Sequence, residues 1–179
     1  MSNFDLVIFD CDGVLVDSER LAITCTRRSR GTWGEVWIGM PSSSPVIERE
    51  LVVVPGVIEA LDAISTTTCI ASSGSHDKMQ FTLGMTGLLD RFEGRIFSVD
   101  QVAHGKPAPD VLVFAADQMG VPPSRCAVIE DSVSGVTAGL AALMTVLAFA
   151  GGVTSASHLS LEGAIVFDDM RELPQLLAH

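Results

Sequence analysis

The sequence lacks any apolar run long enough to cross a membrane. None of its apolar stretches approaches the ~20 residues that a spanning helix needs. The first residues also lack the basic-then-apolar pattern of a secretory signal, because Asp5 and Asp10 interrupt it. We therefore expect a cytoplasmic protein that has no membrane partner.

Basic residues are scarce. The 179 residues include 11 lysines and arginines against 22 acidic residues, which gives a net charge of −11 at neutral pH. So acidic a surface is a poor partner for nucleic acids and anionic membranes, and we expect neither. An anionic substrate would have to be met by local positive charge from a lysine, a metal ion or a helix N-terminus.

Cysteines are also few, and their spacing fits neither a metal site nor a disulfide framework. The four are Cys11, Cys25, Cys69 and Cys126. Three of them lie in or beside segments that we expect to be buried strands, where a cysteine acts as a small hydrophobic residue. With 47% apolar residues, the chain can bury the core of one domain with a small insertion.

The rest of the chain is organised around the segment from Phe4 to Ser18. Its apolar run Leu6–Phe9 is typical of a strand buried on both faces of a parallel sheet. Asp10 and Asp12 follow, and alternate positions of an extended segment point the same way. Two neighbouring carboxylates repel each other unless a cation lies between them, and hard oxygen ligands favour Mg²⁺. An isolated Asp-x-Asp-Gly stretch is also typical of a solvated turn, so the interpretation needs support from elsewhere.

Three later stretches give that support. Cys69–Ser75 is a short apolar strand that runs into hydroxyls and a glycine, whose N–H groups can bind phosphate at a helix start. His104–Asp110 holds a lysine just before a helix started by proline, and Cys126–Ser132 is a buried strand that ends in two acids. Each alone has a plainer interpretation, as loop serines, a surface lysine or an N-capping Asp131. Their order on strand ends favours one shared site at the carboxyl edge of a sheet.

Together the four stretches resemble the motifs of the haloacid dehalogenase superfamily. FDCDGVLVDSE is similar to its first motif, IASSGS to its Ser/Thr motif, GKPAPD to its lysine motif and VIEDSVSG to its acidic motif. The resemblance covers residues 1–19 and 55–179, within the branch of phosphoglycolate phosphatases and beta-phosphoglucomutases. Four motifs in the order of the family are far more specific than any one of them.

The resemblance implies roles for individual residues. Asp10 would be the nucleophile that forms an aspartyl-phosphate, and Asp12 would be the general acid and base. Ser72 would bind the phosphoryl oxygens, with Ser73 and Gly74 beside it. The remaining implied roles are charge neutralisation and phosphate binding by Lys106, and Mg²⁺ coordination by Asp10, Asp12, Glu130 and Asp131.

The implied fold is α/β, a three-layer Rossmann-like core with a mainly parallel sheet and helices on both faces. We expect this core to comprise residues 1–18 and 55–179. The family inserts a helical cap after the first motif, and residues 19–54 are too few for a full cap of this kind. The alternatives are a truncated cap, a splice-like scar, or an oligomerisation surface that exposes Trp33 and Trp37 and joins a homodimer.

The resulting functional hypothesis is a Mg²⁺-dependent phosphomonoester hydrolase of small phosphorylated metabolites, such as sugar or sugar-acid phosphates. The stretch SSGSHDKMQ resembles phosphatases that hydrolyse 6-phosphogluconate. A phosphotransferase of the beta-phosphoglucomutase kind is an alternative, although Ala22 stands where similar mutases carry a histidine. A further alternative is a cap-deficient relic that binds metal and phosphate with little or no turnover.

Three further positions carry expectations. His76 and Lys78 follow the phosphate loop, and both are predicted to be solvated surface side chains, with a substrate-facing His76 as the alternative. Leu143 stands where the family has a glycine, so we expect a strained backbone there if the turn requires a positive φ.

Overall fold

Six apolar segments pair side by side as parallel strands in the part of the chain that the structure describes. This computed structural model describes residues 3–18 and 51–178. The central strands are buried on both faces, as their unbroken apolar sequences predict. The strands are β1 (Leu6–Phe9), β2 (Thr67–Ser72), β3 (Ile96–Ser98), β4 (Cys126–Glu130), β5 (Thr145–Phe149) and β6 (Ala164–Phe167).

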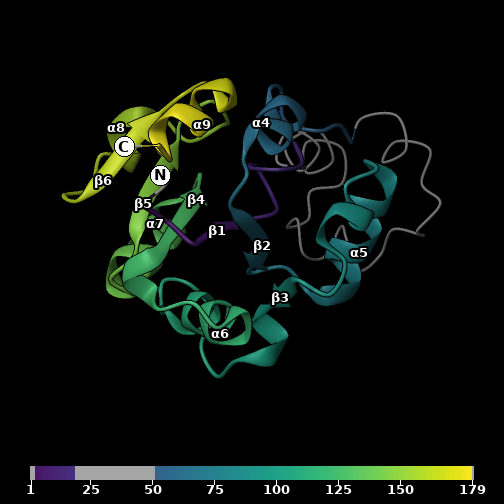
Figure 1. Ribbon diagram of the computed structural model, residues 1–179, viewed down its shortest axis with the longest axis horizontal. Coiled ribbons are helices and arrows are strands. Elements are labelled where there is room, and N and C mark those ends of the chain that lie inside the picture. Colours follow the sequence, from purple (N-terminus) through teal and green to yellow (C-terminus); the bar gives the residue numbers. More distant parts are fainter. Residues whose placement is uncertain (1–2, 19–50, 179) are drawn as a thin grey trace, which may run out of the picture.

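The strand order β3-β2-β1-β4-β5-β6 puts the first strand in the middle of the sheet (Figure 1). The chain builds β2 and β3 on one side of β1 and then crosses to the other side for β4, β5 and β6. The order therefore reverses between β1 and β4, and open α/β sheets bind ligands beyond the carboxyl ends of their strands at such a reversal. The prediction of a Rossmann-like α/β core with a mainly parallel sheet is confirmed.

Two of the α-helices begin at a serine that caps them. Ser75 caps α5 (His76–Met85) and Ser132 caps α7 (Val133–Ala141), each accepting a hydrogen bond from a backbone N–H of the first turn. The closing segment of the described chain is a 3₁₀ turn followed by one turn of α-helix. The α-helices are α4 (Val57–Ala63), α5 (His76–Met85), α6 (Asp110–Met119), α7 (Val133–Ala141), α8 (Ala156–Leu159) and α9 (Leu173–Leu176). The 3₁₀ helices are η1 (Leu89–Phe92), η2 (Val99–Gln101), η3 (Pro123–Arg125) and η4 (Met170–Glu172). Within the described ranges, none of these helices has the length and apolarity of a membrane span.

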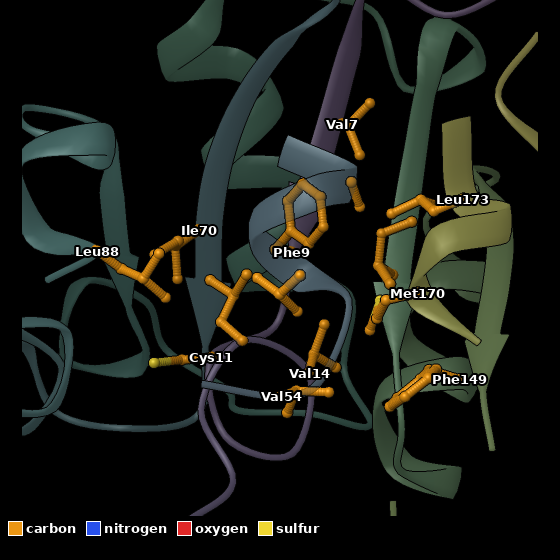
Figure 2. Close-up of a cluster of buried hydrophobic side chains, with 14 of the residues drawn as sticks. Val7, Phe9, Cys11, Val14, Val54, Ile70, Leu88, Phe149, Met170 and Leu173 are labelled. Carbon is orange, nitrogen blue, oxygen red and sulfur yellow. The ribbon is translucent and has the colours of Figure 1, made fainter. Parts of the chain in front are cut away.

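Helices cover both faces of the sheet and so make three layers. On one face, alternate strand residues such as Phe9 and Ile70 pack with α4, α5 and α9. Figure 2 shows Phe9 in the middle of this cluster. On the other face, Leu6 and Ile8 pack with α6 and α7. Figure 1 shows α4 and α9 on the opposite side of the sheet from α6. Because successive strand residues alternate between the two faces, each strand contributes to both cores.

The described residues on either side of residues 19–50 lie next to each other. The Asp17 N–H donates to the Val52 carbonyl at 2.9 Å, and the Val54 N–H donates to the Leu15 carbonyl at 3.0 Å. Val54 is buried and joins the apolar cluster in Figure 2. All but the last four residues of the predicted cap lie outside the described part of the chain, so the domain boundaries stay a prediction.

Two predictions about single residues are confirmed. Cys11, Cys69 and Cys126 are buried free thiols, whereas Cys25 lies outside the described residues. Leu143 has a φ of 59°, which is the left-handed conformation expected for the glycine that the family has there.

Candidate active site

The carboxyl ends of β1, β2 and β4 meet beside the point where the strand order reverses. Asp10 directly follows β1, Ser72 ends β2, and Glu130 ends β4 with Asp131 next to it. The Asp10 N–H donates to the Ile129 carbonyl at 3.0 Å, which ties the residue after β1 to β4. Predicted residues from three separate parts of the sequence therefore gather at one edge of the sheet.

Lys106 reaches this edge from the loop before α6. Its Nζ donates hydrogen bonds to Asp10 Oδ1 at 2.6 Å, to Glu130 Oε1 at 2.5 Å and to the Ala71 carbonyl at 2.9 Å. These contacts use all three donors of the ammonium group, and the side chain is only 3% exposed. Lys106 is thereby fixed between the ends of β1, β2 and β4.

Asp10, Glu130 and Asp131 form an acidic cluster. One oxygen from each of the three buried carboxyl groups lies within 4.8 Å of the other two. Two glycines make room for it. A Cβ on Gly13 would lie 2.0 Å from Asp131 Oδ2, and a Cβ on Gly135 would lie 1.9 Å from the Glu130 carboxyl carbon. Closely spaced carboxylate oxygens are the ligands that Mg²⁺ prefers, so the residues present fit this ion.

One lysine does not balance three carboxylates. Burial raises the pKa of Asp10 to about 7, although the charge of Lys106 acts in the opposite direction. Burial also acts to lower the pKa of Lys106, but the charges of Asp10 and Glu130 outweigh it, and that pKa is raised. The cluster therefore favours either a proton on Asp10 or a bound cation, because both reduce the repulsion among the carboxylates.

Asp12 has a different set of partners. Ser18 Oγ donates to Asp12 Oδ1 at 2.5 Å, and Lys78 Nζ donates to Asp12 Oδ2 at 2.6 Å. The Lys78 side chain is 14% exposed, so the prediction of a solvated surface lysine was wrong. The physical reason is that helical side chains lean toward the N-terminus of their helix, and Lys78 lies in the first turn of α5. Both carboxylate oxygens of Asp12 are thus engaged by groups outside the acidic cluster.

The predicted phosphate loop, residues 72–75, runs from the end of β2 into α5 and lies against Asp12. A Cβ on Gly74 would be 3.7 Å from Asp12 Oδ2. Ser72 is buried, and its Oγ accepts a hydrogen bond from the Gly74 N–H at 3.3 Å. Ser98 Oγ donates to the Gly74 carbonyl at 2.9 Å and holds the loop from the end of β3. At the start of α5, the His76 N–H donates to Asp100 Oδ2 and the Lys78 N–H donates to Ser75 Oγ, both at 3.3 Å, so anion binding by this loop stays a prediction.

Ser73 on the loop and His76 just after it lie at the protein surface. Ser73 is exposed on the phosphate loop, and its proposed role in phosphate binding stays a prediction. His76 is exposed, as predicted, and its ring contacts Gln80 Nε2 at 3.1 Å. His76 is thus an exposed side chain at the start of α5.

The sequence analysis missed three side chains that hold the site together. Lys78 and Ser18 donate hydrogen bonds to Asp12, and Ser132 Oγ donates to Glu130 Oε2 at 3.1 Å. Signals for two of them were present. Ser132 directly follows the two acids at a helix start, and Lys78 stands three residues after the N-cap of the helix that begins at the phosphate loop.

Comparison with known proteins identifies the family. Residues 33–142 match the model of the haloacid dehalogenase-like hydrolases. The chain belongs to this family. The resemblance drawn from the four motifs is thus confirmed, and so is the prediction of a hydrolase.

Known relatives align with most of the chain. The 6-phosphogluconate phosphatase of Escherichia coli K12 is 27% identical over 89% of this chain and 93% of that protein. The alignment runs over 209 residues, more than the 179 of this chain, so it includes residues of that phosphatase without a counterpart here. A solved haloacid dehalogenase-like protein of unknown function from Agrobacterium tumefaciens is 31% identical, with a TM-score of 0.82 over 98% of each chain. A solved family hydrolase from Deinococcus radiodurans, with bound phosphate and sodium, is 27% identical, with a TM-score of 0.78 over 99% of this chain and 96% of that chain.

Proposed function

We propose that this hydrolase is a Mg²⁺-dependent phosphomonoesterase that works through an aspartyl-phosphate on Asp10. The observation that supports this most is the meeting of Asp10, Lys106, Glu130 and Asp131 at the carboxyl edge of the sheet. A carboxylate can attack a phosphate dianion only where the negative charges are screened. Lys106 and a divalent ion among the three carboxylates would supply that screening.

In the first step, a carboxylate oxygen of Asp10 attacks phosphorus, and the bond from phosphorus to the leaving-group oxygen breaks. Asp12 gives a proton to the departing oxygen, which leaves as an alcohol. Lys106 orients Asp10 through the hydrogen bond to Oδ1. Ser72, Ser73 and the backbone N–H groups at the start of α5 bind the phosphoryl oxygens during the transfer.

In the second step, Asp12 takes a proton from water, and the water oxygen attacks phosphorus. The bond between phosphorus and Asp10 breaks, inorganic phosphate leaves, and Asp12 is again protonated for the next cycle. The Ser18 hydroxyl next to Asp12 Oδ1 can serve both states of the carboxyl group, because a hydroxyl both donates and accepts.

The proposed ligands of Mg²⁺ are the carboxylates of Asp10 and Asp131, with Glu130 directly or through water and the backbone carbonyl of Asp12. The fit rests on the spacing of the buried carboxylate oxygens and on the room left by Gly13. When bound, Mg²⁺ supplies Lewis-acid polarisation of a phosphoryl oxygen and neutralises part of its charge.

The proposed substrates are small phosphorylated metabolites, in particular sugar or sugar-acid phosphates. Support comes from the similarity to the 6-phosphogluconate phosphatase of E. coli and from the SSGSHDKMQ stretch. We further propose the division into a core of residues 1–18 and 55–179 and a truncated cap of residues 19–54. The residues of the E. coli enzyme without a counterpart here support a shortened chain. A homodimer and a cytoplasmic location stay predictions.

A hydrolysis assay tests this proposal. Phosphate release should be measured from p-nitrophenyl phosphate and from a panel of sugar phosphates, 6-phosphogluconate and phosphoglycolate, with Mg²⁺ or with a chelator. We expect Mg²⁺-dependent turnover that disappears in Asp10→Asn. Absence of metal-dependent turnover with every ester would favour the relic instead. The mutase alternative is not favoured. The position at which similar mutases carry a histidine is Ala22 here, and it lies outside the described residues.

A further inference from the structure

Asp12 is held by two side chains with different hydrogen-bonding abilities. Lys78 Nζ can only donate, and it lies 2.6 Å from Oδ2. The Ser18 hydroxyl, 2.5 Å from Oδ1, can donate to an ionised carboxylate or rotate and accept from a protonated one. A proton on Oδ2 would point at the ammonium donor, whereas a proton on Oδ1 finds an acceptor. Lys78 therefore occupies Oδ2, and Oδ1 is the oxygen whose neighbour can take part in proton exchange.

Helix stability does not explain a lysine at this position. The helix α5 begins at His76, so Lys78 lies in the first turn, where the helix dipole disfavours a cation. The ammonium group is also turned away from solvent, since the side chain is only 14% exposed. The contact links α5 to the loop after β1, 66 positions earlier in the sequence.

The lysine is packed as well as paired. A Cβ on Gly74 would be 3.7 Å from Lys78 Cδ and 3.7 Å from Asp12 Oδ2, so both side chains of the pair lie against the phosphate loop. The loop thus limits the directions in which the two side chains can move. Without Lys78, Oδ2 loses its charged donor and the carboxyl group can turn about its χ2 angle.

We propose that Lys78 is a positioning residue that fixes Oδ2 of Asp12 and so leaves Oδ1 as the oxygen that exchanges a proton with the leaving group. The proposal rests on the proposed phosphatase function, in which Asp12 protonates the departing oxygen. A proton donor matters more when the leaving group is more basic. Lys78 should therefore contribute little to the release of p-nitrophenolate and much to the release of phenolate, which has a similar shape but is more basic.

The experiment compares kcat/KM for p-nitrophenyl phosphate and phenyl phosphate, because kcat/KM covers the steps up to departure of the leaving group. Lys78→Met removes the ammonium group but keeps an unbranched side chain that suits a helix. We expect the loss with phenyl phosphate to exceed the loss with p-nitrophenyl phosphate by about tenfold or more, part of the ~10²–10⁴-fold that a positioned proton donor contributes.

Two controls isolate the role of Asp12. In an Asp12→Asn background, Lys78→Met should leave the ratio of the two kcat/KM values unchanged, because effects of Lys78 that act only through the Asp12 carboxylate are absent there. Asp77→Asn changes the charge of the exposed neighbour on α5, and both rates should stay within about twofold of wild type.

Equal losses with the two esters in Lys78→Met would overturn the proposal, since the lysine would then act on the phosphate or on folding. A shift of the ratio that is as large in the Asp12→Asn background would also overturn it. A wild-type protein that hydrolyses neither ester with Mg²⁺ would remove the proposed function and this inference with it. The wild-type rates therefore distinguish the two kinds of failure.

Discussion

The two aspartates of the first motif stand two residues apart, yet each is paired with its own lysine in a different environment. Asp10 meets Lys106 in a pair whose side chains are 11% and 3% exposed, beside two further carboxylates. Asp12 meets Lys78 in a pair whose side chains are 22% and 14% exposed, with a serine hydroxyl on its other oxygen. The first pair is enclosed by strand ends, and the second lies between a loop and the first turn of a helix.

The difference matches two kinds of chemical work. A nucleophilic carboxylate must stay next to fixed positive charge, and burial keeps that charge from being screened by water. A carboxyl group that gives a proton to the substrate and takes one from water needs partial access to solvent. In the proposed mechanism, the two pairs would thus divide charge screening and proton transfer between neighbouring residues.

The largest expected effect separates the two aspartates directly. Asp10→Asn removes the nucleophile, and we expect kcat/KM for p-nitrophenyl phosphate to fall by at least about 10⁴-fold. Asp12→Asn should retain more activity with this ester, because p-nitrophenolate leaves without a proton. Steady-state kinetics with saturating Mg²⁺ gives both values. Equal residual activity in the two variants would show that the residues do not have separate roles.

The two lysines should differ in their effect on stability. Lys106→Met leaves Asp10 and Glu130 buried without their cation, which should cost about 3–5 kcal/mol of the free energy of unfolding. Lys78→Met breaks a more exposed pair and should cost about 1 kcal/mol. Urea unfolding in the presence of a chelator measures both losses. Similar losses for the two variants would contradict the contrast in burial.

The pH dependence of stability should depend on Asp10. Its pKa is raised to about 7 in the folded protein, whereas an unfolded aspartate titrates near pH ~4. The folded state therefore binds more protons between these pH values, and the contribution of Asp10 to stability falls as pH rises from about 4 to 7, by at most ~1.4 kcal/mol per pH unit. Urea unfolding of the metal-free protein at several pH values should show this slope.

Asp10→Asn is the control for that slope. The difference in free energy of unfolding between wild type and this variant should change with pH in chelator. It should change less with Mg²⁺ present, because the ion takes the place of the proton. A difference that is constant across this pH range without metal would mean that Asp10 titrates normally.

The smallest expected effect is that of Leu143, which lies outside both aspartate–lysine pairs and serves as a reference. Leu143 is 81% exposed and has a φ of 59°. Leu143→Gly should relieve the backbone and raise the free energy of unfolding by about 0.5–1 kcal/mol, with no change in kcat/KM. Leu143→Ala keeps the unfavourable φ and should give no such gain in thermal or urea unfolding. A gain with alanine equal to that with glycine would point to the exposed side chain and not to the backbone.

The residues around Asp10 in the buried pair can be predicted from the sequence far better than the partner of Asp12 in the more exposed pair. Asp10, Glu130 and Asp131 each follow an apolar run, and parallel strands end at one shared edge, so their meeting could be predicted. The motif also placed Lys106, although its three hydrogen bonds could not be read from the sequence. Lys78 stands on a helix, and the direction of its side chain depends on how α5 packs against the loop after β1, which is a matter of tertiary packing.

The segment after the first motif is a second region whose structure the sequence predicts poorly. Within residues 19–54, residues 24–34 have no clear helical period, so the sequence predicts little about the structure of the insertion beyond its truncation. The resemblance to the family implies that this insertion would help to select the substrate. The sequence therefore indicates the reaction more firmly than the substrate.

The binding of beryllofluoride, which mimics a phosphoryl group on an aspartate, tests the convergence on Asp10 most directly. With Mg²⁺ present, ¹⁹F NMR of the wild-type protein should show a bound beryllofluoride resonance. The resonance should disappear in Asp10→Asn and when Mg²⁺ is chelated. A bound resonance that persists in Asp10→Asn, or none in the wild type at saturating Mg²⁺, would contradict a phosphoryl-accepting Asp10 beside a metal ion.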